Sequence, residues 1–156
     1  MLTTESILQS VIGPRLIQDI RTSQLDRGLV ASGKSSKSLS FTVEREGQRI
    51  TFTVIGSSSW YFQQNGRRPN AKKGRPSNWL INVIREWIQV KNLSIPLAAA
   101  GAIAYKITNE GIHVPNRFNR GGVLSEPLNK GRIVSLLKPD LLAHYVDSFT
   151  SQLFAA

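Results

Sequence analysis

Apolar residues recur three and four positions apart over the first part of the chain, from Thr4 to Arg27. This spacing places them on one face and predicts an amphipathic helix. The pair Gly13-Pro14 interrupts the pattern. Because proline lacks a backbone donor and clashes with the preceding turn inside a helix, we expect a short helix, a kink near Ile12 and a longer helix that ends near Gly28.

Helical spacing appears three more times, at Asn78 to Val90, Pro96 to Asn109 and Asp140 to Leu153. Gly111 is expected to end the second of these helices, since glycine is common just beyond a helix end. Pro139 is expected to begin the third. The first of the three has one predicted apolar face, made of Trp79, Leu80, Val83, Ile84, Trp87 and Ile88.

A different period marks Leu39 to Arg45 and Arg49 to Ile55, where apolar and polar residues alternate. This alternation predicts two strands of an antiparallel hairpin with one buried face and a turn at Glu46-Gly47. Hairpin and helices together predict an α+β fold: N-terminal helices, a small sheet packed by helices, a long basic loop and a C-terminal helix. A length of 156 residues suits one domain, residues 1–156.

The basic loop lies between the hairpin and the helix that starts at Asn78. It runs from Gly66 to Pro76 and contains two glycines, two prolines, five cations and no acidic residue. Glycine and proline predict irregular backbone here, and like charges repel one another and hold such a loop open. We therefore expect it to bind a negative partner. The candidate partner-facing residues are Arg67, Arg68, Lys72, Lys73 and Arg75, with Arg117 and Arg120 from a second basic loop at 116–122.

An aromatic run, Trp60-Tyr61-Phe62, precedes the loop. Large aromatic residues mostly pack in cores and interfaces, so we expect Trp60 and Phe62 to anchor the loop to the core while Tyr61 faces elsewhere. Gly66 is expected to end a short helix as a left-handed cap. The alternative is that these aromatic rings stack on bases beside phosphate contacts.

The net charge is +10, from 20 Lys and Arg against 10 Asp and Glu. Nucleic acid is the commonest polyanionic partner of a small basic domain, although charge of this kind can also serve solubility alone. Cysteine is absent, which excludes disulfides and thiolate metal sites. The sequence shows no secretory signal peptide and no transmembrane run, so we expect no membrane partner.

Catalytic and cofactor chemistry finds little support. His113 and His144 lie far apart without acids at metal-ligand spacing, so we expect no metal, no cofactor, no catalytic residue and no enzyme activity. The stretch Gly28–Ser35 does match the phosphate-binding P-loop pattern in full. No apolar strand leads into it, however, and no apolar strand of the chain ends in Asp, as that site requires. We interpret it as a hinge followed by a short helical turn, with nucleotide binding as a weaker alternative.

The order of these elements resembles that of the tail-completion proteins (neck or head–tail joining proteins) of tailed bacteriophages. The resemblance covers roughly Leu25 to Phe118. Its motifs are Ala31-Ser32-Gly33-Lys34 with Ser38-Leu39 before the hairpin, then Trp60-Tyr61-Phe62 followed by Gly66-Arg67-Arg68-Pro69.

The resemblance implies a structural protein of the virion at the head–tail junction, assembled in the host cytoplasm, with no enzyme activity. It implies a homo-oligomeric ring, sixfold or twelvefold, that contacts portal or adaptor and tail proteins around the DNA channel. The basic loops would face either this channel or acidic patches of adjoining rings. The alternative function is a stand-alone basic nucleic-acid-binding module.

Overall fold

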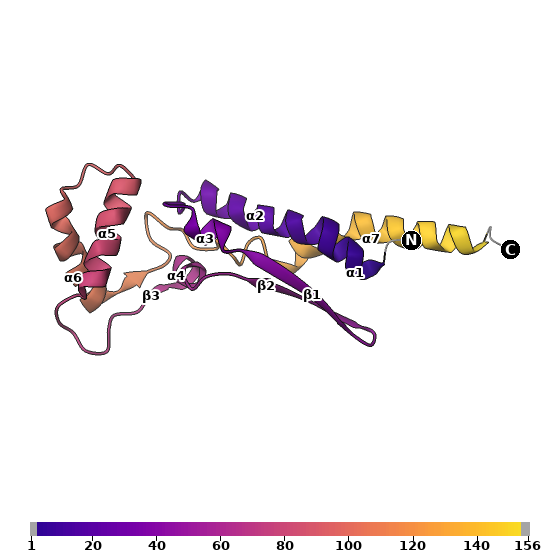
Figure 1. Cartoon of the computed structure of the whole chain (residues 1–156), viewed down its shortest axis with the longest axis horizontal. Coiled ribbons are helices and arrows are strands. Elements are labelled where there is room, and N and C mark those ends of the chain that lie inside the picture. The colour runs from indigo at the N-terminus through magenta and orange to yellow at the C-terminus, as the bar shows by residue number, and fades with distance from the viewer. Residues whose placement is uncertain (1–2, 154–156) are drawn as a thin grey trace.

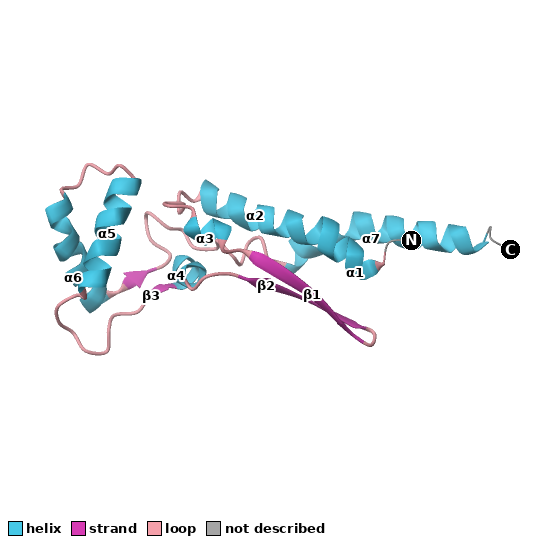
Figure 2. Cartoon of the chain, in the orientation of Figure 1, coloured by secondary structure: helices cyan, strands magenta, loops and turns pink. Residues whose placement is uncertain are grey.

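The computed structural model describes residues 3–153, with side chains through residue 150. The fold is α+β, as predicted, and the molecule is elongated (Figure 1). One end holds a pair of helices. The remainder combines a long N-terminal helix, a β-hairpin and a long C-terminal helix (Figure 2).

The N-terminal helix runs through the Gly13-Pro14 pair without a break. It consists of α1 (Thr4–Ile7), a π-helical segment (Leu8–Ile12) and α2 (Gly13–Asp26). The predicted interruption is therefore a change in helical winding rather than a separation into two helices. Proline is tolerated because it lies in the first turn of α2.

The hairpin consists of β1 (Ser40–Glu46) and β2 (Arg49–Ile55), with Glu46 opposite Arg49. It confirms both predicted strands to within a residue. On its inner face the rings of Phe41 and Phe52 stack with centroids 5.3 Å apart. The outer face carries polar and charged side chains.

A first hydrophobic cluster joins the hairpin to the helices. Its buried members are Leu16, Ile17, Ile20, Leu39, Trp60 and Val123. Two short helices, α3 (Lys34–Lys37) and α4 (Ser59–Asn65), lie beside it. This cluster therefore combines residues from the start, the middle and the end of the chain.

The C-terminal helix α7 (Lys130–Leu153) contains Pro139 instead of starting there. The prediction of a helix beginning at Asp140 is thus wrong. Proline leaves the carbonyl of Ser135 without its helical donor, and because both residues are exposed to solvent, water can satisfy that carbonyl. Ion pairs fix α7 beside α2: Arg15–Asp140 at 2.6 Å and Arg132–Asp19 at 3.1 Å.

A second hydrophobic cluster lies in the helix pair at the other end of the molecule. It joins α5 (Asn78–Val90) to α6 (Ala100–Glu110), which a 3₁₀ turn (Leu97–Ala99) precedes. Its buried members are Leu80, Ile84, Ile88, Ala100 and Ala104. Ser77 caps α5 by accepting a hydrogen bond from the Leu80 amide, and the small alanines let the two helices approach closely.

Two short strands connect the helix pair to the rest. β3 (Gly66–Arg67) pairs antiparallel with β4 (Ile112–His113). Gly66 and Gly111 both have positive φ, near 78° and 77°, and ψ near ±165°. Gly66 is therefore extended rather than the left-handed cap that we predicted. A Cβ at either position would overlap backbone of the opposite strand.

No helix within residues 3–153 combines the length and apolar character that a membrane span requires.

Candidate interaction surface

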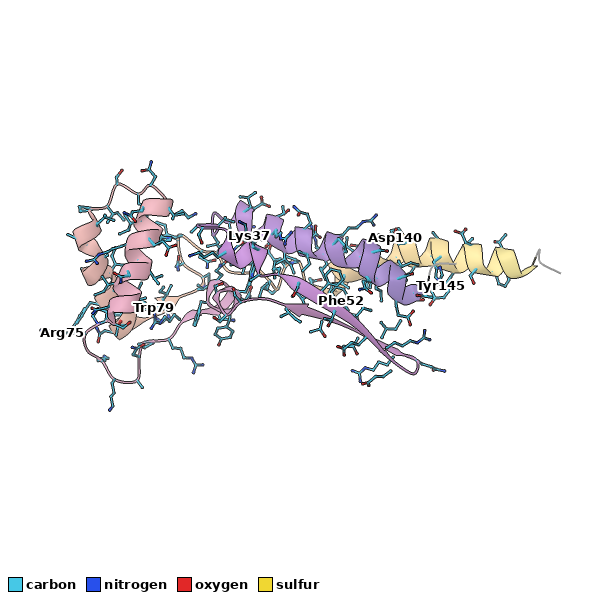
Figure 3. The ribbon with its side chains drawn as sticks, in the orientation of Figure 1. Lys37, Phe52, Arg75, Trp79, Asp140 and Tyr145 are labelled. Carbon is cyan, nitrogen blue, oxygen red and sulfur yellow. The ribbon has the colours of Figure 1, made fainter. Side chains whose placement is uncertain are left out.

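The first basic loop lies at the outer edge of the helix pair, between β3 and α5. Arg68, Lys72, Lys73 and Arg75 are exposed, and Arg67 is half-buried at the end of β3. Figure 3 labels Arg75 at this edge, where its side chain points away from the molecule.

The C-terminal end of α6 holds the loop in place. The Asn70 amide donates to the Thr108 carbonyl at 2.8 Å. The Asn109 side chain makes two bonds to Gly74: its Oδ1 accepts from the amide at 3.0 Å and its Nδ2 donates to the carbonyl at 3.1 Å. The loop is therefore open to solvent and fixed in shape. Sequence reasoning missed Asn109, because its only local signal is a polar residue near a helix end.

The charge of the loop is not compensated within the chain. Across the described residues 3–153, the ion pairs include none of the four exposed cations of this loop. Arg67 donates to the neutral side-chain oxygen of Asn70 at 3.2 Å. A negative partner would thus meet these cations without displacing a carboxylate of the protein itself.

The second basic loop lies elsewhere, against α4 and the end of α2. The Asn119 side chain donates to the Gln63 carbonyl at 2.8 Å, and the Arg27 guanidinium donates to the Gly121 carbonyl at 2.9 Å. Arg117 lies 4.4 Å from the centroid of the exposed Phe118 ring. The β3–β4 ladder brings the stems of the two basic loops together, but their tips contact different helices.

Glu126 reduces the charge of this second loop. Its carboxylate lies 2.5 Å from the buried guanidinium of Arg27 and 3.9 Å from that of Arg120. The hydrogen bond from Arg27 lowers the pKa of Glu126 below its ordinary value, so this carboxylate stays ionised at neutral pH. Arg120 is therefore partly compensated, unlike the cations of the first loop.

The aromatic run divides between the core and the surface. Trp60 is buried, as predicted, and its indole nitrogen donates to the Ser35 carbonyl at 3.0 Å. Tyr61 faces solvent, also as predicted. Phe62 is 48 % exposed, so its predicted role as a core anchor is wrong. Both exposed rings border a hollow of about 580 Å³ that Arg67 and Arg68 also line.

A larger apolar groove of about 700 Å³ separates α5 from α3 and α4. Four residues of α5 form one of its walls: Trp79, Val83, Trp87 and Val90. The single apolar face predicted for this helix is therefore two faces. Leu80, Ile84 and Ile88 pack against α6, whereas the other stripe lines the groove and stays partly exposed. Figure 3 labels Trp79 near the basic loop.

The P-loop match has a different structural role. The helix α2 precedes it, Gly33 has positive φ, and the four-residue α3 follows. Lys34 forms an ion pair with Glu86 of α5 at 3.0 Å. The hydroxyl of Ser35 accepts a hydrogen bond from Gln24 at 2.7 Å. The geometry agrees with a connection followed by a short helical turn.

Among the described residues no group of three or more His, Cys, Asp or Glu could hold a metal ion. Comparison with protein-family models, with curated proteins and with solved structures finds no match for this chain.

Proposed function

We propose that this chain is a structural subunit of the head–tail connector of a tailed bacteriophage, where identical copies form a ring around the DNA channel. The observation that carries the proposal is the first basic loop, which is fixed by α6 and has four exposed cations outside any internal ion pair. Repeated around a ring, such loops would present positive charge that attracts phosphates without reading bases.

Exposed apolar surface also supports an assembly. The groove stripe on α5 and several apolar residues of α7 remain partly exposed in the single chain. Contiguous apolar patches on a protein surface mark interaction sites. A ring would cover such patches by contacts between neighbouring copies, and a head-to-tail contact closes into a ring when its rotation fits.

Oligomeric state and the basic loop together test the proposal. We expect light scattering and negative-stain imaging of the purified chain, alone or with a portal protein, to show rings. We expect changing Arg67, Arg68, Lys72 and Lys73 together to Ser to leave the fold intact, because surface changes usually shift stability within about 0.5 kcal/mol each. Ring assembly or DNA retention should fall.

A matched control removes the same charge elsewhere. Lys37, Arg49, Lys130 and Lys138 are also exposed, and we expect their joint replacement by Ser to change assembly and DNA retention much less. Equal loss in both quadruple variants would show that only total charge matters. Unfolding of the loop variant, with normal assembly of any folded fraction, would show that the loop is structural and would contradict the proposal.

One observation favours the alternative of a stand-alone nucleic-acid-binding module. Tyr61 and Phe62 are exposed beside Arg67 and Arg68, and bases stack on aromatic rings next to cations in single-strand binding proteins. This function predicts monomers, salt-sensitive DNA binding, and weaker binding when Tyr61 is changed to Ala.

A further inference from the structure

Two apolar surfaces lie at opposite ends of the molecule. One is the groove between α5 and the short helices α3 and α4. The other is the part of α7 that continues beyond the N-terminal end of α1 (Figure 1). Because they are at opposite ends, the α7 of one chain cannot fill the groove of the same chain.

The groove has the form of a site for an apolar helix face. Its α5 wall places apolar residues four and three positions apart along 13 helical residues, about 20 Å at 1.5 Å per residue. Trp79 is 69 % exposed and Val90 is 47 % exposed, so the groove opens to the surface. On the opposite wall Phe62 is exposed as well.

The projecting part of α7 presents a matching face. Leu142, Tyr145, Val146 and Phe149 occur at helical spacing and are between 54 % and 64 % exposed. Figure 3 shows Tyr145 where α7 passes the N-terminal end of α1. Apolar anchors at such spacing on one helix are how an amphipathic helix binds a hydrophobic groove.

Charge complements shape. Residues 140–156 contain two aspartates and no lysine or arginine, a formal charge of −2 within a chain of net charge +10, so the other 139 residues carry +12. The groove itself is lined by Lys34 and Arg67 against the single carboxylate of Glu86. The C-terminal helix is thus the part of this chain whose charge sign suits the groove.

From these features we infer that the projecting part of α7 of one copy binds in the α5 groove of the next copy. The contact joins two different surfaces, so it is head-to-tail, and each copy both donates a helix and receives one. The inference deepens the proposed function and rests on it for the identity of the partner, since a ring requires a contact of this kind.

The absence of cysteine from the sequence allows a direct test. One variant carries Val83→Cys in the groove, and another carries Val146→Cys on α7. After the two are mixed and mildly oxidised, we expect a disulfide between chains at least tenfold more abundant than in either variant alone. Peptide mass spectrometry identifies the linked positions.

Asp147→Cys provides the matched control, because residue 147 is about 100° further around the helix than residue 146. A mixture of Val83→Cys with Asp147→Cys should link much less. Equal linking at both positions would indicate random collision and would overturn the inference.

A second variant tests the contact without oxidation. Tyr145→Ser with Phe149→Ser changes only partly exposed side chains, so circular dichroism should remain that of the unchanged protein while light scattering shows a shift to monomers. Ala143→Ser, also exposed on α7, should retain the oligomers. Unchanged oligomers in the double variant would contradict the inference.

The outcomes separate this contact from the proposed function. Rings without the specific disulfide would overturn the contact and leave the connector proposal standing. A specific disulfide in a protein that forms no ring and binds no portal protein would support the contact and contradict the connector. Monomers at every concentration, with no disulfide, would overturn both.

Discussion

Gly13 is the position at which the N-terminal helix lies against the hairpin. It is buried, and a Cβ built on it would overlap the ring of Phe41. That ring in turn stacks on Phe52. The side-chain-free surface of one glycine therefore sets how closely helix and sheet approach.

Replacing Gly13 by Ala should destabilise the protein. Alanine would gain up to about 1 kcal/mol in helix propensity, but the displaced Phe41 ring should cost about 1–3 kcal/mol, as overpacked cores do. We expect a net loss of free energy of unfolding, measured by urea denaturation.

Gly101 provides the control for this prediction. It lies in α6, and a Cβ there would meet nothing within 4 Å. Gly101→Ala should therefore raise the free energy of unfolding by about 0.4–1 kcal/mol. Stabilisation by both substitutions would mean that Phe41 does not pack on Gly13.

At this scale the sequence predicts some contacts and not others. Burial of Trp60 and exposure of Tyr61 follow from a helix that presents one side to the core. Phe62 was predicted to be buried, but the groove beside it is unfilled in the single chain. Asn109 could not be predicted as a support of the basic loop, because its partner Gly74 lies 35 residues away.

Among the elements, the basic loop depends on α6 for its shape. Both groups of the Asn109 amide bond the backbone of Gly74, and Thr108 accepts from Asn70. A loop rich in like charges would otherwise sample many conformations. Its fixed shape thus comes from a helix that follows it in sequence.

Asn109→Ala should loosen this loop without unfolding the protein. Two hydrogen bonds to Gly74 are lost, each worth about 0.5–1.5 kcal/mol. We expect trypsin to cleave after Lys72 and Lys73 several-fold faster, as measured by mass spectrometry of timed digests.

Asn82→Ala is the matched control for the loop. Asn82 is exposed on α5 and accepts a bond from Arg85 of the same helix. Cleavage within the loop should stay at the rate of the unchanged protein. If Asn109→Ala also leaves that rate unchanged, contacts other than the side chain of residue 109 hold the loop.

Elements whose local signals agree were predicted well. The hairpin and the helix at 78–90 match their predicted bounds nearly residue for residue. The errors lie at Pro14 and Pro139, where proline was taken to break or begin a helix. Position in a first turn and ion pairs to α2 decide these cases, and neither is visible in local spacing.

Over the whole molecule, two hydrophobic clusters are separated by the α5 groove. Few contacts cross between them: the β3–β4 ladder, the Lys34–Glu86 ion pair, and a hydrogen bond of 2.7 Å from Lys91 to the Gly28 carbonyl. The prediction of one domain for residues 1–156 leaves open how strongly the two clusters are coupled.

Core truncations in the two clusters should act separately. Ile88→Ala removes a side chain that is 2 % exposed, and Ile20→Ala one that is fully buried; each should cost about 2–5 kcal/mol. With hydrogen exchange as the measurement, Ile88→Ala should speed exchange mainly in 78–110, and Ile20→Ala mainly in 13–55. Equal acceleration in both segments with either variant would show one cooperative unit.

The way the first cluster is assembled has a consequence for synthesis on the ribosome. Ser23 bonds the carbonyl of Val123, 100 residues later, and Val123 is a buried member of that cluster. The helix pair α5–α6 uses only contacts nearby in sequence, which form quickly. It can therefore fold as it emerges, whereas the apolar face of α2 must wait, uncovered, until most of the chain has been made.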